Sequence, residues 1–296
     1  MTEGVGLGPV RKVGFVLRQG SSEPVEVLKR LLTRARSLDM ETFLDPAEVP
    51  ELEDGVAPLE GNEAELDVLI TLGGDGTLLR GARRVARCDV PVLGVNLGRL
   101  GFLTSVPAEE AEEALDGVVE GRCGLDSRTT LEAQVIRTHG DASEPLFALN
   151  DLVYHNAGVA RVVHVDLRVG EGEEQEEMGS FSGDGVIVSS PTGSTAYSLS
   201  ASGPIVEPSV DCLLVTPVSP HTLSVRPLVL PAGATLTIRS LASSDEVVLT
   251  ADGQVGGRVG PGEEVRVRTG RTRVHLVRFP GHTFFSTLRR KLNWAI

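Results

Sequence analysis

Two hydrophobic periods alternate along the first third of the chain. Residues 12–17 (KVGFVL) form a short apolar run that predicts a buried strand. Residues 23–38 instead repeat apolar positions every three or four residues, which predicts an amphipathic helix. Runs at residues 68–72 and 90–98 predict further strands, so this part reads as a Rossmann-like α/β domain with a parallel sheet.

A glycine-rich turn follows the strand at residues 68–72. Its sequence is Gly73-Gly74-Asp75-Gly76-Thr77, and helical periodicity resumes at Leu78. Strand-to-helix turns of this kind bind phosphates, because glycines allow close approach and helix N–H groups point at the anion. The turn matches neither G-x-G-x-x-G nor G-x-x-x-x-G-K-[ST]. Asp75 would repel phosphate, so it either caps the helix or serves the chemistry, and the turn alone leaves both open.

The pattern changes after a helix predicted at residues 107–121, and we place the domain boundary near residue 105. From there the chain consists of short β-branched runs separated by Gly, Pro or charged turns, which predicts an all-β, sandwich-like domain. The predicted strands are residues 129–138, 146–156, 162–170, 185–190, 234–241, 246–254, 263–269 and 273–279. The tail at residues 283–294 predicts an amphipathic helix that returns to the first domain. We therefore expect an α/β domain of residues 1–105 plus 281–296, a β-rich domain of residues 106–280, and a ligand site in the cleft.

Two charged stretches predict surface features. Residues 45–64 are acidic and contain three prolines, which favours a loop or lid. Residues 170–178 (GEGEEQEEM) contain no histidine and no ordered ligand spacing, so a solvated hairpin tip is favoured over a metal site.

Composition narrows the classes of protein. A formal charge of −13 over 296 residues argues against nucleic-acid or anionic-membrane partners. Three widely separated cysteines and no apolar run of membrane-spanning length favour a reduced, cytoplasmic location. The histidines show no metal-ligand spacing.

Two polar stretches in the β-rich half are further candidate sites. Residues 183–204 gather small hydroxyl residues around Gly193, which favours a cradle for a polar ligand over a simple connection. Asn150 and Asp151 interrupt an apolar run. Burying both is costly unless they are paired, so they predict either a satisfied core network or a substrate-binding pair.

Together these stretches carry a resemblance to NAD kinases. The segments LGGDGTLL, LNDLVYH, SGDGVIVSSPTGSTAYSLSASGP, TPVSPHTLSVRPLVLP and DGQ follow the order and approximate spacing of that family over nearly the whole chain. The SPTGSTAY block is the most specific of them. The resemblance implies phosphoryl transfer to the 2′-hydroxyl of the adenosine ribose of NAD, giving NADP.

The resemblance also assigns roles to residues. It implies that Asp75 is the general base and that Gly73, Gly74, Gly76 and Thr77 form the phosphate loop. The implied contacts to NAD and the donor are Gly76, Arg80, Asn150, Asp151, Arg161, Ser182, Asp184, Thr195, Ala196, Tyr197, Ser198, Leu199, Ser200 and Gln254. For Arg80, a surface arginine without a ligand is an equal alternative.

Cofactors and assembly are also matters of resemblance. Relatives carry arginine or glycine at the position of Ser182, where differences are associated with the choice of donor, so ATP and polyphosphate both stay open. Magnesium is expected to arrive with the donor phosphates. A homodimer or homotetramer is implied. The alternatives are a lipid kinase of the diacylglycerol or sphingosine type and a non-catalytic NAD/NADP sensor.

Overall fold

The computed structural model describes residues 7–20, 22–45, 48, 55–99, 101–158, 162–241 and 247–294. The chain forms two compact units, residues 1–128 with 273–296 and residues 129–272. These limits differ from the expected 105 and 281, because the helix after residue 105 packs on the first helix of the chain. The expected domain limits stay a prediction.

The first unit contains a parallel sheet in the order β5-β4-β1-β2-β3, with β6 beside β5. The sequence forms these strands at the predicted apolar runs: β1 (Lys12–Leu17), β2 (Glu41–Leu44), β3 (Val56–Pro58), β4 (Val68–Gly73), β5 (Val92–Asn96) and β6 (Val106–Pro107). Val13 pairs with Val68 and Leu69 with Val92, so the carboxyl ends of β4 and β5 are adjacent. β3 lies inside the stretch expected to be a loop, because Val56 pairs with Thr42 of β2.

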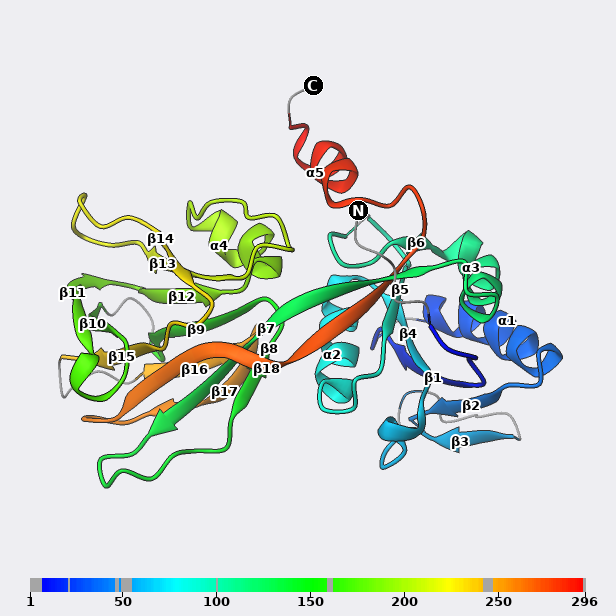
Figure 1. The fold of residues 1–296 in the computed structure, drawn as a ribbon, viewed down its shortest axis with the longest axis horizontal. Helices are drawn as coiled ribbons and strands as arrows, with labels where there is room; N and C mark the ends of the chain where they lie inside the picture. Colours follow the sequence, from blue (N-terminus) through cyan, green and yellow to red (C-terminus); the bar gives the residue numbers. More distant parts are fainter. Residues whose placement is uncertain are drawn as a thin grey trace. The chain divides into compact units, whose positions relative to one another are not determined.

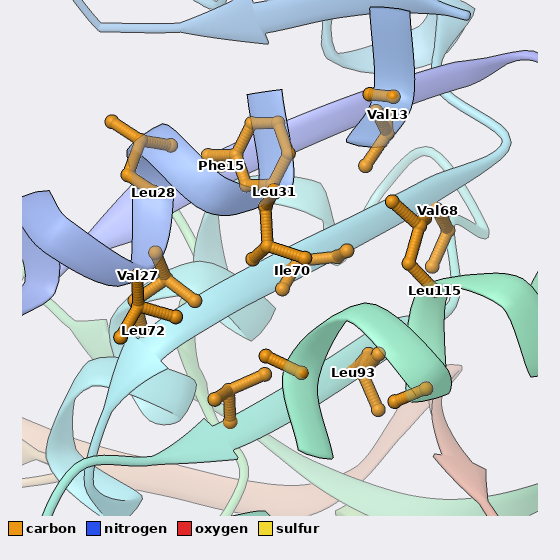
Figure 2. Close-up of a cluster of buried hydrophobic side chains, with 14 of the residues drawn as sticks. Val13, Phe15, Val27, Leu28, Leu31, Val68, Ile70, Leu72, Leu93 and Leu115 are labelled. Atoms are coloured by element: carbon orange, nitrogen blue, oxygen red, sulfur yellow. The ribbon is translucent and has the colours of Figure 1, made fainter. Parts of the chain in front are cut away.

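Helices cover both faces of this sheet (Figure 1). They are α1 (Glu23–Ser37), α2 (Asp75–Val85) and α3 (Ala111–Val119). This unit also contains α5 (Phe284–Leu292), near the end of the chain, and the 3-10 turns η1 (Glu63–Glu65) and η2 (Ala108–Glu110). Leu28 and Leu31 of α1 and Leu115 of α3 face Phe15, Ile70 and Leu93 of the strands (Figure 2). The Rossmann-like expectation for this half is confirmed.

The second unit is an antiparallel sandwich. One sheet has the order β14-β13-β12-β9-β16-β17, and the other joins β11, β10, β15, β18, β7 and β8. The strands are β7 (Gly124–Ile136), β8 (Leu146–Ala148), β9 (Asp151–Asn156), β10 (Val163–Val169), β11 (Glu176–Gly183), β12 (Gly185–Ser189), β13 (Cys212–Val218), β14 (Leu228–Pro231), β15 (Leu236–Ser240), β16 (Val247–Ala251), β17 (Gln254–Val259) and β18 (Glu264–Arg278). The core between the sheets includes Tyr154, Val188 and Leu249. The all-β expectation is confirmed.

Two strand predictions need correction. The runs at residues 263–269 and 273–279 form one strand, β18, rather than two. Gly270 lies inside this strand. A Cβ at this position would lie 2.2 Å from Thr130 Oγ1, so the glycine permits a close approach between strands and does not mark a turn. The run at residues 146–156 is instead split into β8 and β9 around Leu149 and Asn150.

The acidic tract lies where it was expected. β10 and β11 pair antiparallel, and the 3-10 turn η3 (Gly172–Glu174) connects them with exposed glutamates. None of the helices in the described ranges is long and apolar enough to cross a membrane.

Candidate active site

The glycine turn joins β4 to α2 in the first unit. Gly73 is required by the protein's own packing, since a Cβ there would lie 2.2 Å from Thr77 Oγ1. Gly74 and Gly76 differ, because a Cβ at either position would meet nothing within 4 Å. Gly74 is the N-cap residue of α2 but offers no side-chain cap, and the first N–H groups of a helix have no acceptor within it. The turn therefore presents backbone donors and open space.

The Asp75 carboxylate does not cap α2. It binds a loop of the same unit: Oδ2 accepts the N–H of Phe102 at 2.8 Å, and Oδ1 accepts the N–H groups of Leu103 and Thr104, both at 3.1 Å. Thr104 Oγ1 adds a longer contact to Oδ1 at 3.3 Å. Gly101 permits this arrangement, since a Cβ there would lie 1.8 Å from Oδ1. The half-buried carboxylate is thus held in place, and Oδ1 accepts more hydrogen bonds than Oδ2.

Arg80 is ion-paired. Its guanidinium lies 2.6 Å from Glu48 Oε1 and also donates to the carbonyl of Leu17. Glu48 accepts the N–H of Leu17 with its other oxygen. This ion pair is compatible with either reading, so phosphate binding by Arg80 and its equal alternative, a surface arginine without a ligand, both stay predictions.

In the second unit, Asp252 organises the break between β8 and β9. Its carboxylate accepts the N–H groups of Leu149, Asn150 and Asp151 at 2.9, 2.7 and 3.2 Å. Asp252 has a φ of 48°, at the turn between β16 and β17. The backbone N–H groups of Asn150 and Asp151 therefore find their acceptor in a residue about one hundred positions further along the chain.

Among the described acids of this unit, Asp151 has the most strongly shifted pKa. Burial raises its pKa to about 7, the negative charge of Asp252 adds to the increase, and a backbone hydrogen bond from Tyr197 opposes it. Its register partner on β12 is Ser189, so both side chains lie on the same face of the sheet. Ser189 Oγ is buried and has no hydrogen-bond partner among the described residues. The face opposite the sandwich core is thus polar at this point.

The hydroxyl-rich block lies next to this segment. It forms η4 (Thr192–Thr195) and α4 (Tyr197–Ser200). A Cβ at Gly193 would lie 2.0 Å from the carbonyl oxygen of Asn150, so only glycine allows this approach. Ser190 Oγ donates to the carbonyl of Leu149 and its N–H to that of Asn150.

The block divides into structural and exposed side chains. Ser194 bonds with Val206, and Ser198 Oγ lies 2.9 Å from Thr216 Oγ1. Tyr197, one of the predicted ligand contacts, is 47% exposed. The remaining members are exposed or half-buried: Thr195, Ala196, Leu199 and Ser200.

The other predicted contacts lie at separate points of the second unit. Ser182 is half-buried in β11 opposite His164, and the neighbouring Asp184 is exposed. Gln254 is exposed at the start of β17, two residues after Asp252. Arg161 lies outside the described residues.

Sequence reasoning missed three contributors. Asp252 belongs to the DGQ segment, but only Gln254 was singled out. Gly101 and the Phe102–Thr104 loop hold Asp75, and the small residues of GFLTS at 101–105 were the available signal. Among the described residues, no group of three or more His, Cys, Asp or Glu side chains is arranged to hold a metal ion.

Solved structures define the class of protein. Yeast NADH kinase, solved in complex with NADH, matches with a TM-score of 0.88 and 27% identity, covering 97% of this chain and 89% of that one. An NAD kinase from Archaeoglobus fulgidus, solved with ATP, matches with a TM-score of 0.73 and 25% identity, covering 95% and 98%. The fold is therefore that of the NAD and NADH kinases.

Family models and relatives identify the family. The ATP-NAD kinase N-terminal domain matches residues 24–123 and the C-terminal domain residues 149–279. An NAD kinase of Gemmatimonas aurantiaca is 45% identical over 286 residues, covering 96% of each chain. One of Symbiobacterium thermophilum is 45% identical over 284 residues, covering 95% of this chain and 99% of the relative. The chain belongs to the NAD kinase family.

Proposed function

We propose that this chain phosphorylates the 2′-hydroxyl of the adenosine ribose of NAD to give NADP. The observation that carries the proposal is the turn at Gly74–Gly76, where a fixed carboxylate stands between two glycines that face open space. Glycines without a packing reason suit a ligand that approaches the backbone. Family membership supplies the identity of that ligand.

Asp75 acts as the general base. A ribose hydroxyl is a weak nucleophile, and a positioned carboxylate accepts its proton while phosphoryl transfer proceeds. A carboxylate offers about four acceptor directions. Oδ1 accepts three donors and Oδ2 accepts one, so Oδ2 is the oxygen with capacity for a substrate hydroxyl. The loop at Phe102–Thr104 is the element that positions it.

The second unit binds the dinucleotide. We assign ribose and base-edge contacts to Asn150 and Asp151, adenosine contacts to residues 195–200, and the nicotinamide half to Arg161 and Asp184. Exposed Tyr197 is free to stack on a base. Ser182 and Gln254 are further contacts, and Arg80 with the glycine turn contacts phosphate.

ATP is the donor favoured by the family, and polyphosphate remains a second candidate. We assign magnesium to the donor phosphates, which carry it to the site. Free Cys88, Cys123 and Cys212 support a reducing cytoplasm. We also assign the active form to a homodimer or homotetramer, by analogy with the family.

A substrate panel tests the proposal. Purified protein is incubated with ATP and magnesium and either NAD or diacylglycerol, and NADP and phosphatidate are measured. We expect NADP alone to accumulate. Phosphatidate without NADP would point to a lipid kinase, and NAD binding without any product would point to a sensor. No finding supports either of these alternatives at present.

A further inference from the structure

A small cavity of the first unit lies between the loop that holds Asp75 and the start of α5. Its volume is about 130 Å³, and its lining includes Ser105, Asp126, Arg128, Arg278, Thr283 and Arg290. α5 is fixed beside this loop, because the Phe102 and Phe284 rings lie 6.4 Å apart and Lys291 lies 4.9 Å from the Phe102 ring centre. The cavity is thus bounded by the loop that holds Asp75 and by α5.

Arginines outnumber carboxylates in the lining of the cavity. Asp126 is its only carboxylate and is shared: Arg128 Nε lies 2.9 Å from Oδ1, and Arg278 Nε lies 3.3 Å from Oδ2. Arg290 has no carboxylate partner among the described residues. Three arginines and one carboxylate therefore line the cavity, and Arg290 among them is exposed, in a chain whose overall charge is −13.

The pKa of Arg278 is lowered in this setting, chiefly by burial. Burial and the neighbouring positive charge of Arg128 lower its pKa to about 10, and the charges of Asp126 and Asp75 only partly oppose this. Asp75 acts on Arg278 from outside the cavity lining. An anion in the cavity would compensate the buried positive charge.

A buried hydroxyl supplies independent support. Ser105 is only 5% exposed, lines the cavity, and its Oγ has no hydrogen-bond partner within the described part of the chain. Buried hydroxyls are normally satisfied, so an unpaired one beside three arginines indicates a missing acceptor.

We propose that this cavity binds a single phosphate-type oxyanion. The size fits, because about 130 Å³ corresponds to roughly four waters, whereas sites for larger organic ligands occupy about 300 Å³ or more. The chemistry fits too, since guanidinium groups and a hydroxyl are donors that suit phosphate oxygens. The phosphate is either free orthophosphate or a phosphoryl group of the donor.

Occupation of the cavity bears on Asp75. Arg278 donates to the carbonyl of Leu103 at 2.8 Å. The N–H of Leu103 in turn donates to Asp75 Oδ1 at 3.1 Å. A phosphate that accepts hydrogen bonds from Arg278 therefore competes with the Leu103 carbonyl for this guanidinium. The Phe102–Thr104 loop, which positions the Asp75 carboxylate, is affected as a result. This consequence rests on the proposed function, whereas phosphate binding itself does not.

Calorimetry with sodium phosphate in chloride buffer tests the site without any turnover. The parent should bind one phosphate per chain, and Arg290→Gln should weaken binding about tenfold, the loss expected from one charge-assisted hydrogen bond. Ser105→Ala should also weaken phosphate binding while melting no lower than the parent in chloride. Arg289→Gln is the matched control, because Arg289 lies on the same helix outside the cavity and should bind like the parent.

Absence of phosphate binding by the parent, or equal affinities of Arg290→Gln and Arg289→Gln, would overturn the proposal. ATP added without NAD then identifies the source. Displacement of bound phosphate by ATP assigns the cavity to a donor phosphoryl group, and undisturbed binding assigns it to free orthophosphate.

Discussion

Asp75 has two tasks that the structure separates by oxygen atom. Among the described residues, Oδ1 accepts donors from the Leu103–Thr104 segment, whereas Oδ2 accepts only the N–H of Phe102. An amide at this position keeps one oxygen but presents an N–H group to at least one of these donors. Substitution therefore tests the base and strains the loop at once, and a control must separate the two effects.

Asp75→Asn should lower kcat by on the order of 10²-fold or more while leaving NAD affinity nearly intact, because the proton acceptor is lost. Thr104→Val is the control, since it removes only the 3.3 Å hydroxyl contact to Oδ1 and should stay within a few-fold of the parent. Steady-state kinetics and calorimetry on the same preparations provide the comparison. Equal losses in both variants would assign Asp75 to loop positioning and remove its role as base.

Asp151 makes stability depend on pH. Its folded-state pKa of about 7 lies above the unfolded value of about 3.9, so its contribution is fully present below pH 4 and is lost as pH rises through 7. Asp151→Asn removes this dependence. We expect the variant to gain stability over the parent, by an amount larger at pH 8 than at pH 5.

Urea unfolding of both proteins at the two pH values measures this difference. Other titrating groups cancel in the comparison, because they are common to the two chains. A difference that does not change between pH 5 and pH 8 would show that the Asp151 carboxyl carries its charge in the folded protein throughout this range.

At the residue scale, the sequence predicted which residues are candidates for the site but not which residues they contact. The glycine turn marked Asp75 as unusual, yet its donors come from Phe102–Thr104, roughly a turn, a helix and a strand further along the chain. The same holds for Asp151, whose pKa depends on Asp252 across the turn of another hairpin. Local periodicity carries no information about such pairs, because only the folded sheet brings them together.

At the scale of elements, α5 has the best-defined start. Thr283 accepts the N–H of Ser286, and Ser286 Oγ accepts the N–H of Thr283, which is a reciprocal capping box. Thr283→Ala should cost about 1 kcal/mol of helix stability. We expect faster hydrogen exchange in the first turn of α5, by about fivefold.

Arg289→Ala on the same helix is the matched control and should leave exchange in the first turn unchanged. Mass spectrometry of peptides covering α5 resolves the effect. If exchange in α5 is the same in Thr283→Ala and in the parent, its contacts with the rest of the unit, and not the cap, fix the start of the helix.

Element prediction succeeded where the hydrophobic period was long and uninterrupted. α1 and β4 begin and end within a residue or two of their patterns. Element prediction failed where a glycine or a polar pair is compatible with both a strand and a turn. Gly270 resembled a turn but lies in a strand against Thr130, and Asn150 resembled part of a strand but breaks one, because Asp252 binds the backbone there.

At the scale of the whole molecule, we expect an oligomer. The motive is family membership, and the monomer mass is 31.4 kDa. Light scattering at assay concentration should give two or four times that mass. A fully active monomer would contradict this expectation without affecting the assignment to the family.

The central claim is that the chain converts NAD to NADP, and the most direct test is to measure that conversion. Purified protein, NAD, ATP and magnesium are incubated, and the product is read with a dehydrogenase that accepts NADP but not NAD. The account predicts NADP formed in equal amount to ADP, and its loss in Asp75→Asn. NAD binding by calorimetry with no NADP formed from either ATP or polyphosphate would contradict it.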